Sequence, residues 1–272
     1  MHHSFQNKIA WITGASSGIG EGLAIACARA GAKLVLSARR EAELHRVKQS
    51  AGLTDENCLV LPMDMEKIDE FPAKLDAVLK KFGTIDYLFH NAGISQRSFV
   101  KDTPLSIDQK VLNINFFSVV ALTKLVLPVF LEKKSGHFII TSSLVGKFGT
   151  PMRSAYSASK HALHGFFESL RAESWRDGIQ VTIVCPGYVK TNISLNAVNE
   201  QGKNYGKMDE NQAKGMDPVD CANRILSAVQ KGKREVLIGG KETLGVYLKR
   251  FFPALLWRVV RNYNFKTVEN HP

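Results

Sequence analysis

Lys8-Ile-Ala-Trp-Ile-Thr-Gly-Ala-Ser-Ser-Gly-Ile-Gly20 is an apolar run that ends in three closely spaced glycines, and an alanine-rich segment, 21–30, follows it. The apolar run suits a buried strand and the alanine-rich segment a helix. Between a strand and a helix, glycines let the backbone approach a pyrophosphate, while the helix start offers unpaired N–H groups. Three glycines can also serve only a tight bend, but their place between strand and helix favours nucleotide binding.

The rest of the chain alternates in the same way between apolar runs and helical segments. Strands are expected at 33–37, 58–62, 85–89, 137–143, 180–185 and 234–238, and helices at 41–50, 66–82, 107–131 and 217–229, with another beginning near Arg153. This alternation predicts an α/β fold: a single Rossmann-type, doubly wound parallel sheet of about seven strands, with helices on both faces. No linker or repeat marks a second domain. We expect one cofactor-binding domain over 1–240 and a C-terminal helical extension over 241–272.

Composition supports a folded chain in a reducing compartment. An apolar content of 44% in 272 residues is ample for a buried core. The four cysteines are scattered, which argues against a metal site or a disulfide framework. Segment 1–7 has no apolar core typical of a secretory signal, and no uninterrupted apolar run reaches spanning length. We therefore expect a cytoplasmic location, with membrane association as the alternative.

The formal net charge of +11 is the unusual bulk property. Basic proteins bind nucleic acids, anionic membranes or phosphorylated cofactors. No basic stripe interleaved with stacking aromatics is present, so nucleic acid is not expected as a partner.

The segment Tyr156-Ser-Ala-Ser-Lys160 stands near the start of an expected amphipathic helix. Residues four apart lie on one helix face, so the phenol and the ammonium can meet at one site. A free tyrosine titrates near pH ~10, and a nearby cation lowers that pKa towards the range useful for acid–base catalysis. The alternative is a surface Tyr and Lys that merely share a face.

Other candidate residues stand at strand ends or within apolar segments. Ser143 follows the expected strand 137–143, where ligands bind in open α/β sheets. Asn115 lies among apolar residues and needs hydrogen-bond partners if it is buried. After strand 33–37, Arg39 and Arg40 stand where NAD-binding sites carry a carboxylate. Arg39 could hold a 2′-phosphate with its planar fork, or the pair could simply be solvated.

Two later segments favour binding roles. Segment 192–216 lacks a clear period and is rich in polar residues and glycine, which is typical of a lid or a binding loop. Segment 243–262 mixes aromatic residues with arginines, and Pro253 should divide it into two short helices. It could lie in a membrane interface, or pack on the substrate pocket or on a second subunit.

Together these motifs resemble the classical short-chain dehydrogenases/reductases over about 8–238. The resemblance rests on Thr13–Gly20, Asn91-Ala-Gly93, Asn115, Ser143, Tyr156-x-x-x-Lys160 and Pro186-Gly-Tyr-Val-Lys-Thr191. Within the family the chain looks most like the membrane-associated dehydrogenase/reductase member 7 group, judged by segment 154–167 and the aromatic, basic tail. Two positions depart from the family pattern: His90 replaces a frequent asparagine, and Phe117-Ser118 stands where glycine is common.

The resemblance implies a catalytic set. Tyr156 would be the general acid in reduction and the base in oxidation, and Lys160 would lower its pKa and bind the nicotinamide ribose. Ser143 would hydrogen-bond the substrate oxygen, and Asn115 would hold a water that links Lys160 to solvent. The family also commonly forms homodimers or homotetramers through its long helices.

NADP(H) is the cofactor that the resemblance favours, because the acidic residue is absent at Ala38 and Arg39 follows it, and NAD(H) is the alternative. The implied cofactor residues are Thr13, Gly14, Ser16, Ser17, Gly18, Ile19, Gly20, Ser37, Arg39, Arg40, Asp64, Asn91, Ala92, Gly93, Tyr156, Lys160, Pro186, Gly187, Val189 and Thr191.

The expected substrate pocket is mostly apolar and consists of Ser143, Leu144, Val145, Phe148, Met152, Tyr188 and Leu195. We therefore predict an apolar ketone, aldehyde or secondary alcohol, such as a steroid, a retinoid or a lipid-like carbonyl. The competing function is a catalytically silent NADP(H)-binding sensor or scaffold. The complete set of Asn115, Ser143, Tyr156 and Lys160 argues against it, because a sensor needs no proton donor beside the nicotinamide.

Overall fold

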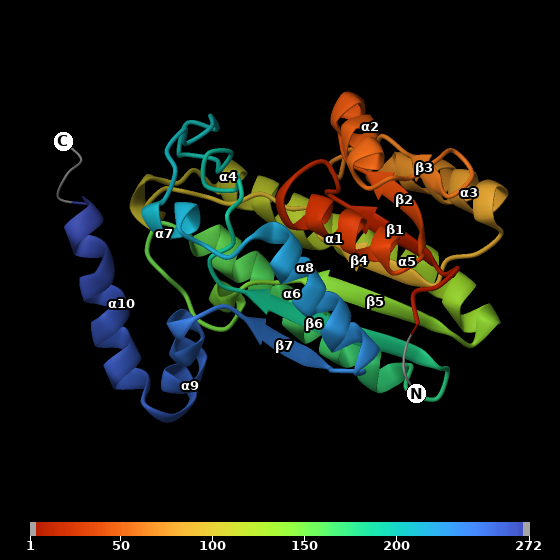
Figure 1. The fold of residues 1–272 in the computed structure, drawn as a ribbon. Helices are drawn as coiled ribbons and strands as arrows, with labels where there is room; N and C mark the ends of the chain where they lie inside the picture. The colour runs from red at the N-terminus through yellow and green to blue at the C-terminus, as the bar shows by residue number, and fades with distance from the viewer. Residues whose placement is uncertain (1–3, 269–272) are drawn as a thin grey trace.

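A seven-stranded parallel sheet organises the computed structural model, which describes residues 4–268 (Figure 1). Its strand order is β3-β2-β1-β4-β5-β6-β7. The strands are β1 (Ile9–Thr13), β2 (Lys33–Ser37), β3 (Cys58–Val60), β4 (Tyr87–His90), β5 (Gly136–Thr141), β6 (Ile179–Pro186) and β7 (Glu235–Ile238). The order reverses beside β1, where chain crossovers pass to opposite faces. The predicted doubly wound fold is confirmed.

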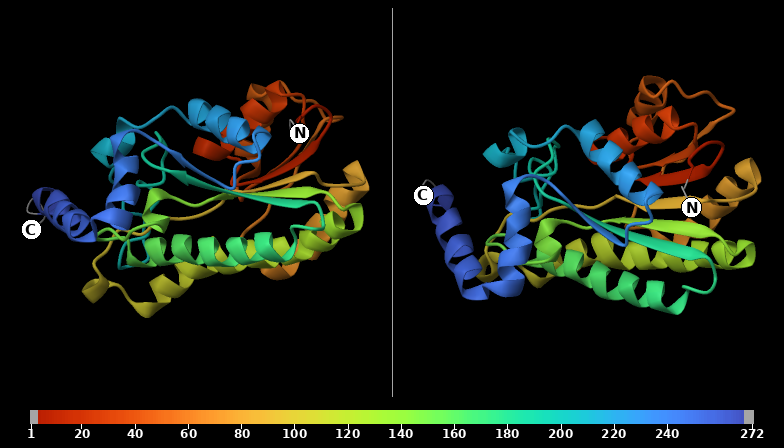
Figure 2. Two further views of the ribbon diagram at one scale, coloured as in Figure 1. Left: turned by 90° about the horizontal axis from the view of Figure 1, so that it is seen from below. Right: turned by 60° about the horizontal axis from the view of Figure 1, so that its bottom comes forward.

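Helices cover both faces of the sheet, as the two views of Figure 2 show. One layer contains α1 (Gly18–Arg29), α2 (Glu41–Ser50) and α8 (Pro218–Gln230), and the other contains α3 (Phe71–Phe82), α4 (Leu105–Leu112), α5 (Ser118–Lys133) and α6 (Ser154–Glu173). Successive side chains along each strand point to opposite faces of the sheet, so they contribute to two separate hydrophobic cores. Trp11 of β1 packs towards α3 and α5, whereas its neighbour Ile12 packs towards α1 and α8.

The predicted helix 107–131 is present but irregular. Helical structure runs from Leu105 to Lys133, with a five-residue π-helical stretch, Asn113–Phe117, between α4 and α5. Asn115 lies in this stretch, fully buried. By length and composition this is the one helix among residues 4–268 able to span a membrane, yet its inner face packs on β5 and α3, as in a core helix.

Several boundaries differ from the sequence prediction. The predicted helix 66–82 starts late: a short 3-10 turn, Ile68–Glu70, precedes α3, which carries Pro72 in its first turn. Strand β5 ends at Thr141, so Ser143 lies beyond it and begins the 3-10 turn Leu144–Gly146. Segment 192–216 is irregular as predicted, apart from isolated bridges and the short helix α7 (Glu210–Ala213).

The C-terminal segment forms the two helices that Pro253 predicted: α9 (Leu244–Phe251) and α10 (Pro253–Val268). Figure 1 shows α10 standing away from the sheet, next to α9. Leu256 packs inward, whereas Tyr247, Phe251 and Trp257 are exposed. This extension therefore adds apolar surface rather than a second core.

Removing one core ring tests this packing. Phe138 on β5 is fully buried, and its ring centroid lies 4.7 Å from that of Phe130 and 6.4 Å from that of Phe167. We expect Phe138→Ala to lower the free energy of unfolding by about 3–5 kcal/mol, because it leaves a cavity. The matched control is Phe251→Ala, at a side chain that is 68% exposed, with a change within about 0.5 kcal/mol. Chemical denaturation measures both, and equal losses would contradict the assignment of this core.

Candidate active site

A cavity of about 940 Å³ lies at the carboxyl ends of the strands. It extends from the glycine turn after β1 to segment 192–216. Most of the predicted cofactor residues line it: Gly14, Ser16, Ser17, Gly18, Ile19, Ser37, Arg39, Arg40, Asp64, Asn91, Ala92, Gly93, Tyr156, Lys160, Pro186, Gly187, Val189 and Thr191. The structure therefore brings together residues that follow five different strands and residues of α6.

The glycine turn fits a phosphate cradle because side chains are excluded from it. Gly14 has φ +67°, and a Cβ there would lie 2.8 Å from the Cα of Ala92. A Cβ on Gly20 would overlap the Gly14 carbonyl and lie 2.7 Å from the Asn91 amide nitrogen. No side chain caps the start of α1 at Ser17, so its first N–H groups are available to an anion. The residues present suit a dinucleotide pyrophosphate.

Two predicted cofactor residues, Thr13 and Gly20, do not line the cavity but shape it. The Thr13 Oγ1 accepts hydrogen bonds from the backbone N–H groups of Asn91 at 3.0 Å and Ala92 at 3.1 Å, and it donates to the Phe89 carbonyl at 3.2 Å. The Asn91 side-chain amide donates in turn to the carbonyls of Thr13 and Gly14. Thr13 therefore holds the turns after β1 and β4 in one arrangement.

Tyr156 and Lys160 lie in the first turns of α6 and are both buried. The Lys160 ammonium donates to the Thr141 carbonyl at 2.7 Å and lies 5.7 Å from the centroid of the Tyr156 ring. Ser143 lines the same cavity and hydrogen-bonds to Tyr156. The predicted spacing thus places phenol, ammonium and hydroxyl around one space.

The predicted direction of the Tyr156 pKa is wrong for this structure. Burial raises the pKa of the phenol, and the charge of Arg153, the Ser143 hydrogen bond and the charge of Arg97 only partly offset this effect. Burial also lowers the pKa of Lys160 to about 8. The sequence prediction counted the ammonium but not desolvation, which disfavours every buried charge.

The side chain of Asn115 forms hydrogen bonds with other groups of the protein. Its Oδ1 accepts from the Ile94 N–H at 2.8 Å, and its Nδ2 donates to the Ile94 carbonyl at 2.9 Å and to the Ser159 hydroxyl at 3.0 Å. A Cβ on Gly93 would lie 3.0 Å from the Asn115 Oδ1 and 3.6 Å from the Lys160 ammonium. Asn115 therefore fixes the loop after β4 close to Lys160. Its role in holding a water stays a prediction.

The substrate side of the cavity agrees only partly with the predicted lining. Ser143, Leu144, Val145, Phe148, Met152 and Tyr188 line it, whereas Leu195 does not; its neighbours Ile193 and Asn196 do. The lining is also less apolar than predicted, because it includes Arg97, Arg153 and Asp209. The Asp209 carboxylate accepts a hydrogen bond from Arg153 at 2.9 Å and also pairs with Arg97.

Sequence reasoning missed this charged cluster. Arg97 and Asp209 are 112 positions apart, and each lies in an irregular segment with no periodic pattern. Asp209 offered no signal beyond its place in the expected binding loop. Arg153 stands three residues before Tyr156, and that proximity was the one available hint.

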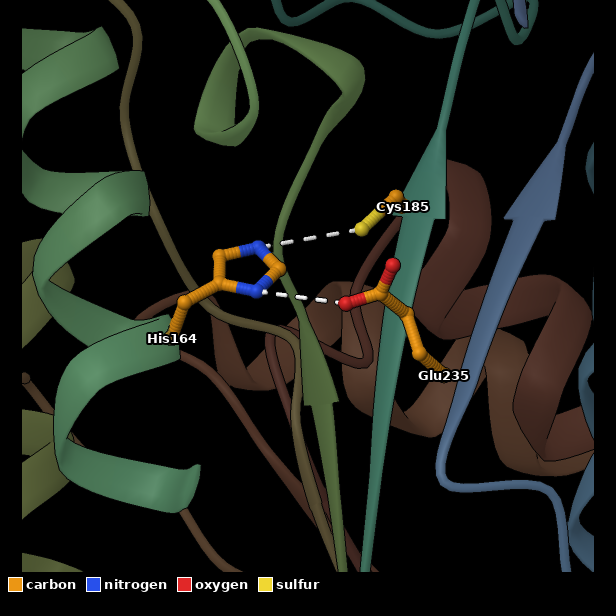
Figure 3. A group of neighbouring side chains, drawn as sticks. All are labelled: His164, Cys185 and Glu235. Carbon is orange, nitrogen blue, oxygen red and sulfur yellow. Dashed lines mark hydrogen bonds and ion pairs between the residues drawn. The ribbon is translucent and has the colours of Figure 1, made fainter. Parts of the chain in front are cut away.

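A second polar group lies between α6, β6 and β7 (Figure 3). His164 of α6 lies with its Nε2 3.7 Å from the Cys185 sulfur and its Nδ1 3.5 Å from the Glu235 carboxylate. Glu235 also pairs with Lys147 at 2.5 Å. Burial raises the pKa of the Cys185 thiol to about 12, so the thiolate form that binds metals is disfavoured. We interpret the group as a structural network between α6, β6 and β7.

With this geometry established, comparison with known proteins decides the family. A sequence profile of the short chain dehydrogenase family matches residues 8–202. The chain is a short-chain dehydrogenase/reductase. Members of the family are oxidoreductases with a nucleotide-binding Rossmann fold that binds NAD(P), so this chain is an oxidoreductase of that kind.

Similar proteins agree with this assignment. The chain is 42% identical over 258 residues to a dehydrogenase/reductase SDR family protein 7-like of Drosophila melanogaster, covering 93% of this chain and 79% of that protein. It is 41% identical over 263 residues to dehydrogenase/reductase SDR family member 7B of Rattus norvegicus, with 94% and 81% covered. These relatives confirm the predicted resemblance to the member 7 group.

Among solved structures, a short-chain dehydrogenase/reductase from Burkholderia phymatum in complex with NAD is similar to this chain. Its TM-score is 0.82 at 25% identity, with 93% of this chain and 96% of that chain covered. Levodione reductase gives a TM-score of 0.78 at 26% identity, with 88% and 99% covered.

A methyl group in the glycine turn tests the cradle. We expect Gly20→Ala to abolish measurable dinucleotide binding, because the new Cβ overlaps the Gly14 carbonyl and displaces the turn. Isothermal titration with NADPH and NADH measures the effect. The control is Gly165→Ala in α6, where a Cβ meets nothing within 4 Å. Unchanged affinity in Gly20→Ala would show that the turn does not form the cradle.

Proposed function

We propose that this chain interconverts a ketone or aldehyde and the corresponding alcohol on an apolar substrate, with NADP(H) preferred over NAD(H). The observation that carries the proposal is the convergence of Ser143, Tyr156 and Lys160 on the same cavity as the glycine cradle. A sensor or scaffold would need the cradle alone.

Tyr156 acts as the general acid in reduction and gives its phenolic proton to the carbonyl oxygen. Its raised pKa keeps it protonated at neutral pH, ready for this direction. Ser143 hydrogen-bonds the same oxygen and stabilises the charge that develops there. Lys160 binds the nicotinamide ribose, and the bound cofactor supplies the hydride. In oxidation the Tyr156 phenolate accepts the alcohol proton, so that direction should gain from higher pH.

NADP(H) preference rests on the end of β2. Ser37, Arg39 and Arg40 line the cavity there, and both arginines are exposed. No acidic residue follows β2 directly to repel a 2′-phosphate, and a guanidinium offers paired N–H donors to it.

The substrate proposal rests on Leu144, Val145, Phe148 and Met152, which give the cavity an apolar wall beside Ser143. A steroid-, retinoid- or lipid-like carbonyl suits this wall. The charged cluster of Arg97, Arg153 and Asp209 lines the same cavity.

The proposal includes contact with further copies of this chain. Phe117 and Leu105 are exposed on the long helical region 105–133, which supports a homodimer or homotetramer through these helices.

The proposal also includes contact with a membrane surface. Phe251, Phe252 and Trp257 are exposed in the C-terminal extension beside Lys249 and Arg250, which supports peripheral contact of a cytoplasmic protein with an anionic membrane.

Tyr156→Phe tests the reaction. Phenylalanine keeps the ring but removes the transferable proton, so we expect loss of nearly all turnover, at least about 100-fold, while NADPH affinity stays unchanged. A panel of apolar ketones, aldehydes and alcohols, followed by cofactor absorbance, measures turnover, and Tyr247→Phe on the exposed face of α9 is the control. Undiminished turnover in Tyr156→Phe would remove the phenol from the mechanism.

Arg39→Ala tests cofactor choice. We expect NADPH binding to weaken by about 1–3 kcal/mol, the scale of a hydrogen bond to a charged group, and NADH binding to change little. Competitive titration of the two cofactors measures the difference. Equal losses for both would show that Arg39 does not distinguish them.

A further inference from the structure

The cluster of Arg97, Arg153 and Asp209 joins three separate segments at the wall of the cavity. Arg97 comes from the loop after β4, Arg153 immediately precedes α6, and Asp209 immediately precedes α7. The Asp209 Oδ2 accepts from both guanidinium groups, at 2.9 Å from Arg153. The side chains are largely inaccessible, with 6% of Arg97, 22% of Arg153 and 24% of Asp209 exposed. Two cations share one anion, so the cluster carries one excess positive charge.

This excess charge lies on the wall of the cavity that Tyr156 also lines. Arg153 is the residue before α6, three positions before Tyr156, and both residues line the same cavity. Gln96, next to Arg97, accepts hydrogen bonds from the Ala155 N–H at 2.9 Å and from the Ser154 hydroxyl at 3.4 Å. The loop that carries Arg97 is therefore attached to the same helix start that carries the phenol.

Other titratable groups that line the same cavity include Lys160, Tyr188, Lys207, Glu210 and Glu242. The Lys160 ammonium is engaged by the Thr141 carbonyl at 2.7 Å. Tyr188 lines the cavity after β6 and interacts electrostatically with Arg153. Lys160 alone therefore does not account for the charge around Tyr156.

We propose that Arg153, assisted by Arg97, is a positioning cation that stabilises the Tyr156 phenolate, and that Asp209 limits this effect by neutralising part of the positive charge. The inference rests on the proposed function only in taking Tyr156 as the acid–base group. The pKa directions agree with it: burial raises the pKa of the phenol, and Arg153 is the largest influence that lowers it.

The proposal predicts pKa shifts of opposite sign in two variants. Arg153→Gln removes a cation, so the phenolate loses stabilisation and the apparent pKa of Tyr156 rises by about one unit. Asp209→Asn removes the anion and leaves both cations uncompensated, so the apparent pKa falls by a similar amount. Charges a few ångströms apart in a partly buried site produce shifts of about 1–3 units. Arg153→Lys keeps the charge and should stay near the parent value.

Two measurements read these shifts. The first is the pH dependence of kcat/KM with NADPH and an apolar carbonyl. The second is the phenolate absorbance of the full chain during alkaline titration, as the difference from the same background carrying Tyr156→Phe. It needs no turnover, so the proposal is tested even where the proposed reaction fails. Asp209→Asn moves the titration towards neutral pH, where it is read most easily.

The outcomes separate charge from structure. The proposal is supported if the apparent pKa of Tyr156 is lowest in Asp209→Asn, intermediate in the parent and highest in Arg153→Gln. The value in Arg153→Lys should lie near that of the parent. Shifts of the same sign in Arg153→Gln and Asp209→Asn would overturn it, because loss of the ion pair alone would affect both variants alike. An Arg153→Lys variant that behaves like Arg153→Gln would also overturn it, and so would the absence of any shift. Arg153 is the better test position, because Arg97 also donates to Ser95 and to the Gln96 carbonyl and is more deeply buried.

Discussion

The hydroxyl of Thr13 ties the ends of β1 and β4 together, and the site depends on this connection. Its three hydrogen bonds set the path of the backbone at Asn91 and Ala92. Ala92 then lies so close to Gly14 that only glycine fits there. One buried hydroxyl thus fixes the space between two neighbouring strand ends, where doubly wound sheets bind their ligands.

The chemistry of the site is a balance between burial and charge. Tyr156 and Lys160 are enclosed, and water is excluded from around them. Charges are therefore screened less and interact more strongly, but burial also disfavours the charged forms, the phenolate and the ammonium. The Tyr156 pKa therefore rises and the Lys160 pKa falls. Ser143 and the two arginines act against the first of these effects. In the proposed mechanism, Ser143 and these two arginines therefore stabilise the buried phenolate together with the lysine of the Tyr156-x-x-x-Lys160 motif.

The fold could be predicted from the sequence because buried parallel strands are apolar throughout and their ends are marked by glycine or by small polar residues. Lys8–Gly20 was sufficient for the first strand, turn and helix, and Tyr156 and Lys160 were found because a helix places fourth neighbours together. Asp209 could not be paired with Arg97, since the irregular segment 192–216 has no period from which its path follows. The direction of the Tyr156 pKa was predicted wrongly, because desolvation depends on how the fold encloses the side chain. Boundaries shifted where a cap or a 3-10 turn intervened, as at Ser143 and Phe71.

The loop after β4 links these features physically. Asn91 contacts the glycine turn, Gly93 lies against Lys160, Ile94 is held by Asn115, and Arg97 reaches Asp209. The π-helical stretch between α4 and α5 places Asn115 under this loop, since one extra residue in a helical turn reorients the side chains that follow. Anchored at both backbone groups of Ile94, the loop cannot shift towards the cofactor cradle without also moving the cation next to Tyr156. The same loop therefore connects the proposed cofactor cradle with the cation proposed to act on Tyr156.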